Sequence, residues 1–232
     1  MWQLVWSELT KFPALVFVFL LPSCLLGLVW WRRLPPPFRI LVVYLWFNLL
    51  TEIGSRIYGH YTKNNLPLLH VYTFGEMLLW SLFYRSVLHP EALLVRYFKW
   101  ITGIMLLAVL LNTVFLQGPL TFNSYAKTLV QLLVILYALS YAFNFLLEEK
   151  PDVALQQVLR PVNAAVLLYY CGSLFIFMFS TLSLSSHQGS FDFLWKVNVV
   201  LNVIFQSIVL FSLCRLLIFK PRKLPSSSVR AS

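Results

Sequence analysis

Polar and ionisable side chains recur every four residues within one long apolar stretch of the sequence. The series consists of Tyr44, Asn48, Glu52, Arg56 and His60. A four-residue step turns an α-helix by about 400°, so successive members lie only about 40° apart on one face. Glu52 and Arg56 are therefore within reach of each other, with the acid in the favourable N-terminal position. Two charges exceed what helix adhesion requires and predict a polar, outward-opening cavity, whereas Asn48 taken alone is better explained as a contact that holds two helices together.

The stretch HVYTFGEMLLW contains a second cluster, formed by His70, Tyr72, Thr73 and Glu76. Glu76 follows Tyr72 and Thr73 by one helical turn and is expected near the middle of its apolar segment. Without a partner it should be protonated, because apolar surroundings disfavour the charged form, whereas facing Arg56 it should stay ionised. The alternative is a neutral acid that hydrogen-bonds a neighbouring helix.

Amide side chains form a third series, Asn198, Asn202 and Gln206, again at four-residue steps. They could form part of a cavity wall or join helices. Asp192 and Lys196 precede them and are expected to be a solvated surface pair. Further polar residues could complete a polar core: Gln131, Asn144, Asn163, Tyr169 and Tyr170.

Several specific chemistries do not fit these residues. His60, His70 and His187 lie in different segments without the HExxH spacing, so we predict no metal and no cofactor. The last apolar segment contains one lysine, Lys196, too near its end for a retinal-type linkage. The sequence also contains neither a GxSxG turn for a nucleophilic serine nor a glycine-rich phosphate-binding loop, and this favours a protein that is not an enzyme.

The composition places all these residues in a membrane protein. The chain is 59% hydrophobic and 11% charged, with a mean hydropathy of +0.77. Its apolar residues form blocks of about 20, the length of a membrane-crossing helix. We therefore predict an all-α polytopic membrane protein, a seven-transmembrane-helix bundle, in which the bilayer rather than nucleic acid explains the net charge of +10.

Residues 1–220 should form one seven-helix domain, followed by a basic, Ser-rich cytoplasmic tail, 221–232. Pro161 is expected to open the sixth span, and 182–190 to form a loop. The first span should remain in the mature protein. The expected spans are 12–31, 39–60, 66–88, 100–116, 125–147, 161–182 and 193–219.

The orientation follows from the basic residues. Positive charges concentrate on the cytoplasmic side of membrane proteins. With the N-terminus outside and the C-terminus cytoplasmic, 13 of the 18 Lys and Arg residues fall inside. We therefore expect an integral protein of the plasma (inner) membrane. The residues then assigned to the outer side are Lys11, Arg56, Lys63, Lys127 and Lys196.

The segment NNLPLLHVYTFGEMLLWSLFY (64–84), followed by an Asn-rich last helix, resembles a group of bacterial seven-helix membrane proteins. The resemblance implies the same topology and carries no activity. It also singles out Asn65, His70, Tyr72 and Glu76.

The leading hypothesis is a receptor-like or sensory membrane protein that binds a small ligand or a proton and signals through a cytoplasmic or membrane partner. A small-solute or proton-coupled transporter or channel is the first alternative, and an intramembrane lipid-modifying enzyme the second. We expect the lipid bilayer to surround the protein, and the sequence does not decide whether the protein forms a homo-oligomer. The predicted ligand-binding or proton-coupling residues are Asn48, Glu52, Arg56, His70, Tyr72, Glu76, Asn198 and Asn202.

Overall fold

The computed structural model describes residues 14–147, 153–186 and 188–218, and the regular elements in these ranges are all helical. Three short elements connect longer helices: η1 (Trp31–Arg33), α5 (Leu93–Arg96) and the π-helical η2 (Asn112–Leu116). The longer helices are α2 (Ala14–Val29), α3 (Pro36–Thr62), α4 (Leu66–Val87), α6 (Phe98–Leu111), α7 (Ser124–Leu147), α8 (Val153–Ser186) and α9 (Gln188–Ile218).

Six helical segments in the described part of the chain are long and apolar enough to cross a bilayer. A seventh apolar helix, Leu15–Val29, is shorter. Large apolar side chains such as Leu50, Leu107 and Phe175 are exposed, as expected where lipid is the solvent. The chain is therefore an integral membrane protein by the length and composition of its helices. The six segments are Pro36–Thr62, Leu66–Val87, Phe98–Leu116, Ser124–Asn144, Leu155–Phe179 and Phe193–Ile218.

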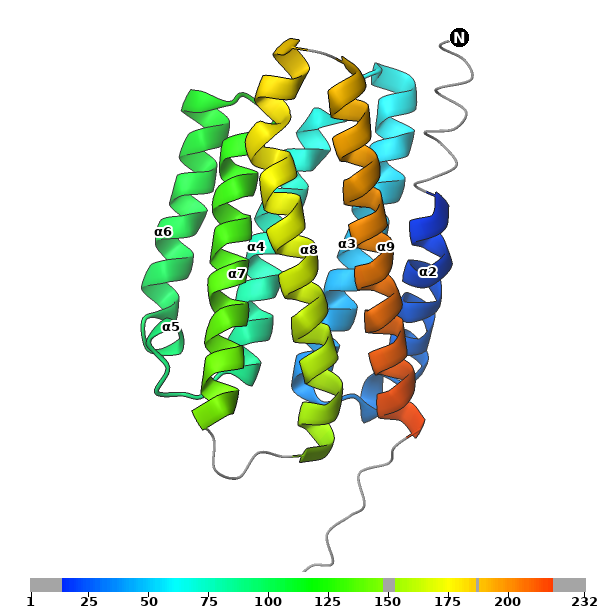
Figure 1. Cartoon of the computed structure of the whole chain (residues 1–232), viewed down its shortest axis with the longest axis vertical. Coiled ribbons are helices and arrows are strands. Elements are labelled where there is room, and N and C mark those ends of the chain that lie inside the picture. Colours follow the sequence, from blue (N-terminus) through cyan, green and yellow to red (C-terminus); the bar gives the residue numbers. More distant parts are fainter. Residues whose placement is uncertain (1–13, 148–152, 187, 219–232) are drawn as a thin grey trace, which may run out of the picture.

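Six helices form a closed ring, in the order α2, α3, α4, α7, α8 and α9, with α9 packing back against α2. Helix α6 lies outside this ring and packs mainly against α4 (Figure 1). Only Thr102 and Val109 are buried among the residues of α6. The interior of the ring is thus where side chains from many helices can meet.

The two ends of the bundle differ in charge. The lower end in Figure 1 carries the η1 segment, the start of α6 and the C-terminal part of α9. Eight basic residues belong to this end: Arg32, Arg33, Arg39, Arg85, Arg96, Lys99, Arg160 and Arg215. The upper end carries the α3–α4 connection and the start of α9, where Arg56, Lys63 and Lys196 lie.

Two expectations about helix ends were wrong. Helix α8 begins at Val153, so Pro161 lies inside it rather than at its start. The preceding residues 153–160 contain no helix-breaking residue, which lets the helix extend by about two turns. The expected loop 182–190 is helical in its described residues, because serine disfavours a helix only weakly. Residue 187 lies outside the described residues.

Local sequence features set the position of α3 against α4. Helix α3 starts at Pro36, where a missing N–H costs nothing. It ends at Thr62, and the next residue, Lys63, has a left-handed φ of 57° and donates its N–H to the Gly59 carbonyl over 2.9 Å. On α4, Gly75 lets the Phe47 ring of α3 approach so closely that a Cβ would collide with it. Phe47 in turn stacks on Tyr72, with ring centroids 6.0 Å apart.

Candidate functional site

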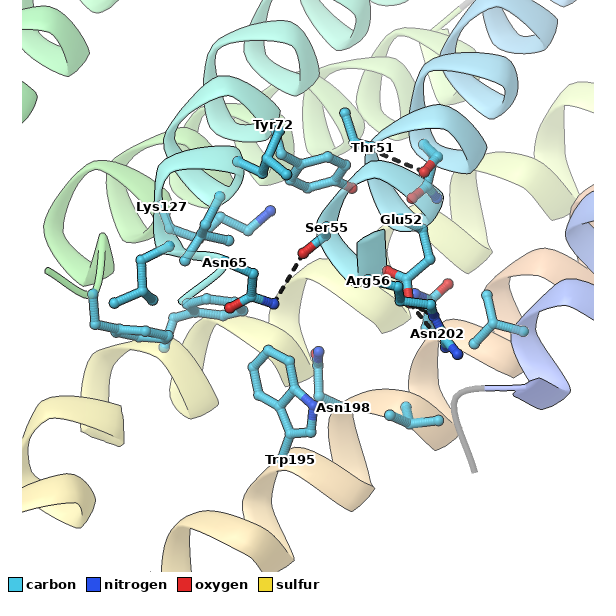
Figure 2. A pocket seen from close by; sticks show the side chains of 18 of the residues that line it. Thr51, Glu52, Ser55, Arg56, Asn65, Tyr72, Lys127, Trp195, Asn198 and Asn202 are labelled. Carbon is cyan, nitrogen blue, oxygen red and sulfur yellow. Dashed lines mark hydrogen bonds and ion pairs between the residues drawn. The ribbon is translucent and has the colours of Figure 1, made fainter. Parts of the chain in front are cut away.

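A cavity of about 710 Å³ lies inside the ring, near the α3–α4 connection (Figure 2). Helices α2, α3, α4, α7, α8 and α9 all contribute lining residues. The cavity therefore brings together segments that are far apart in the sequence. Six of the eight predicted site residues line it: Asn48, Glu52, Arg56, Tyr72, Asn198 and Asn202.

The lining is mixed in character. The hydroxyl and amide groups come mainly from α3 and α9, and Asn65 donates a hydrogen bond to Ser55 over 2.9 Å. Apolar and aromatic side chains form the remaining walls, a composition typical of sites for small organic molecules. These side chains are Val16, Leu66, Leu68, Leu69, Phe122, Tyr169, Phe177, Trp195 and Val199.

The first charged pair, Glu52 with Arg56, behaves as its spacing predicts. The two side chains form a salt bridge with an N–O distance of 3.1 Å. They are 40% and 41% exposed, so they lie where the cavity meets the surface. Where water reaches such a pair, its contribution to stability is at most about 1 kcal/mol.

The second charged pair lies deep in the bundle. Glu76 on α4 accepts a hydrogen bond from the ammonium group of Lys127 on α7, and the two form an ion pair. The Tyr170 hydroxyl on α8 donates to the other carboxylate oxygen over 2.8 Å. Glu76 and Tyr170 are fully buried, and Lys127 is 1% exposed. Together with Tyr170, the ion pair thus connects three helices. Removing one of its charges leaves the other buried without a partner, which lowers the stability of a protein strongly.

Lys127 also faces aromatic rings. Its ammonium nitrogen lies 4.5 Å from the ring centroid of Tyr72 and 5.5 Å from that of Phe177. Such contacts stabilise a buried cation. The Tyr72 hydroxyl lies 3.2 Å from the Tyr44 hydroxyl, so Tyr44 joins the network. Lys127 lines the cavity, whereas Glu76 stands directly behind it.

Lys127 is the residue whose role the sequence analysis missed. It was assigned to the outer surface, and Arg56 was considered as the partner of Glu76. In the structure Lys127 is buried and pairs with Glu76, and Arg56 pairs with Glu52. A signal was present, because Lys127 is the only charged residue in the expected span 125–147 and Glu76 the only acid in 66–88.

His70 lies outside the cavity lining. One ring nitrogen is 3.0 Å from the Thr113 hydroxyl and the other 3.2 Å from the Thr121 carbonyl oxygen. A second chain of bonds runs nearby, from Asn112 to Asn123 and from Asn123 to Thr73. His70 therefore holds α4 to the π-helical turn and the connection that precede α7.

Aromatic side chains pack together below the buried ion pair. Trp80 follows Glu76 by one turn of α4 and is almost fully buried. Its ring centroid lies 4.8 Å from that of Tyr44, 5.9 Å from that of Tyr170 and 6.1 Å from that of Phe205. These four rings come from α4, α3, α8 and α9, and they form a layer between the cavity and the lower end.

Two amides on α9 have unsatisfied buried atoms. The side-chain oxygen of Asn198, which lines the cavity, has no hydrogen-bond partner. Both side-chain atoms of Gln206, which is fully buried, also lack partners. Other described residues, such as Trp46, Trp80 and Gln131, also have a buried side-chain atom without a hydrogen-bond partner, and among the residues with such an atom Asn198 lines the cavity.

Within the described ranges, no group of three or more His, Cys, Asp and Glu side chains could hold a metal ion. Comparison with protein-family models, curated proteins and solved structures found no match. The fold and the site together define a class: a helical membrane protein whose bundle encloses a partly polar cavity with a buried ion pair beside it.

Proposed function

We propose that this chain is a receptor-like membrane protein with seven crossings, which binds a small ligand in the cavity from the outer side. The observation that carries the proposal is the convergence of six predicted polar residues on one cavity of about 710 Å³. That volume suits a small organic molecule.

The proposed response to the ligand is a change in helix packing. A molecule in the cavity contacts six helices, including the three joined by the Glu76, Lys127 and Tyr170 cluster. A ligand shifts a conformational equilibrium only through contacts that differ between the two states. An ion pair beside the ligand supplies such contacts, because its geometry changes when another polar group approaches Lys127.

The proposed orientation places the cavity outside and the basic lower end in the cytoplasm. The concentration of arginine at the lower end supports it through the positive-inside rule. Helix α2, with 16 residues, spans about 24 Å as described and would be the seventh crossing. The basic end would then face a cytoplasmic or membrane partner that receives the signal.

A transporter is the second candidate, and Gln206 favours it. This residue lies one turn beyond Asn202 on α9 and beside Phe205 of the aromatic layer. Its unpaired amide could belong to a pathway that continues below the cavity. Transport along this route would require the rings of the aromatic layer to separate, because their centroids lie 4.8 to 6.1 Å from that of Trp80.

Cysteine accessibility tests the cavity and its orientation together. In a variant without Cys24, Cys171 and Cys214, we expect Asn198→Cys to react in intact cells with a charged, membrane-impermeant thiol reagent. Val209→Cys, about three turns deeper on α9 and fully buried, is the matched control and should not react.

Reaction of Asn198→Cys from the outside supports the proposal. An Asn198→Cys that reacts no faster than Val209→Cys from either side would show that no open cavity exists. Reaction from the cytoplasmic side alone would refute the proposed orientation. For the transporter, acidification of proteoliposomes under an imposed pH gradient, abolished by Glu76→Gln, is the distinguishing result.

A further inference from the structure

We propose that the ligand is a small organic carboxylate and that the ammonium group of Lys127 receives it. This inference rests on the proposed ligand-binding function and adds the chemical class of the ligand. It begins with the charges on the cavity wall.

The charged side chains among the described lining residues are Glu52, Arg56 and Lys127. Glu52 and Arg56 neutralise each other near the surface. Lys127 is neutralised by Glu76, which lies behind the lining rather than in it. The lining therefore contains the cation of this pair, with its side chain 2% exposed, but not the carboxylate that balances it. Such a wall attracts an anion.

Lys127 retains hydrogen-bonding capacity for an anion. A lysine ammonium group has three N–H donors, and Glu76 is its hydrogen-bond acceptor in the structure. The other contacts found for this nitrogen are the ring faces of Tyr72 and Phe177, which are weaker partners than a carboxylate. A charge-assisted bond to a ligand carboxylate is strong in so buried a place.

The remaining wall indicates the rest of the ligand. Apolar and aromatic groups such as Leu69, Phe122 and Trp195 suit an apolar or aromatic body. The unpaired side-chain oxygen of Asn198 accepts a hydrogen bond, so it suits a hydroxyl or amino group on that body. Lys127 and Asn198 approach the cavity from different walls, with Asn65 and Trp195 between them (Figure 2).

Matched acids and amides test the ligand class on the purified full-length protein in detergent. Benzoate and 3-phenylpropanoate are compared with benzamide and 3-phenylpropanamide, which have the same shape without the charge. A ligand that binds the folded state raises the thermal midpoint of unfolding. We expect the acids to raise it at concentrations at least tenfold lower than the amides. Lys196→Met, a change at an exposed lysine outside the lining, should keep this preference.

The double variant Glu76→Gln/Lys127→Met removes both charges while avoiding an unpaired one, and it should lose the preference for acids.

Two results would overturn the inference. The first is equal stabilisation by acids and amides, and the second is a double variant that still prefers acids. If the amides bind and Asn198→Cys is accessible, only the ligand class is wrong. If neither series binds and Asn198→Cys is inaccessible, the proposed function itself fails.

Discussion

The buried ion pair gives the sharpest prediction about stability. Glu76 is 0% and Lys127 1% exposed, so removing one partner leaves a charge that solvent cannot reach well. Breaking a buried pair in this way costs about 3–5 kcal/mol. The group that remains can also become neutral, a lysine by losing a proton and a glutamate by gaining one. At pH 7 this neutralisation costs about 4.6 kcal/mol for a lysine and about 3.7 kcal/mol for a glutamate, calculated from their ordinary pKa values, and these figures are the upper limits of the cost of losing the partner.

We therefore expect Glu76→Gln and Lys127→Met each to lower the free energy of unfolding by about 3–4 kcal/mol. The double variant should be more stable than either single variant by about 3 kcal/mol, because it contains no uncompensated charge. Reversible unfolding in mixed detergent micelles, followed by far-ultraviolet circular dichroism, measures these differences.

The exposed pair of α3 provides the matched control. Glu52→Gln and Arg56→Gln should each change the free energy of unfolding by less than about 1 kcal/mol, because solvent already screens these charges. The reasoning is refuted if the single variants at the buried pair are equally mild. It is also refuted if the double variant shows the sum of the two single effects.

Three further predictions concern the elements that position the cavity. Gly75→Ala should lower the free energy of unfolding by about 1–3 kcal/mol, because the added methyl group meets the Phe47 ring. Adding Phe47→Leu to this variant should restore part of the lost free energy, as measured by a denaturation curve. His70→Leu should cost about 1–3 kcal/mol by orphaning the Thr121 carbonyl, with faster proteolysis of the 117–123 connection as the readout; unchanged proteolysis would count against its holding role. Lys63→Gly should raise the thermal midpoint, because glycine removes about 1 kcal/mol of left-handed strain, whereas Lys63→Ala should not.

The sequence alone was sufficient to predict the class of the protein and the polar residues that a single helix contributes to the site. Apolar blocks of membrane-crossing length exist in any conformation of the chain, and six helices of that kind are present. The four-residue spacing of Asn48, Glu52 and Arg56 places these side chains together because α-helix geometry is local. The same holds for Asn198 and Asn202 on α9.

Spacing could not decide which helices would face one another. The partner of Glu76 is Lys127, 51 residues away, and Tyr170 is 94 residues away. Arg56 was an equally valid candidate on sequence alone, because its charge and depth were suitable. The helix neighbours and the rotation of each helix about its axis select the partner, and both depend on packing throughout the ring.

Packing also separated residues that the sequence had grouped. His70 and Glu76 share helix α4, yet His70 contacts the π-helical turn outside the ring while Glu76 faces its interior. A polar face was therefore readable from the sequence wherever its members share one helix. The cavity, the ion pair beside it and the aromatic layer beneath it exist only in the tertiary structure, because each is made by side chains from different helices.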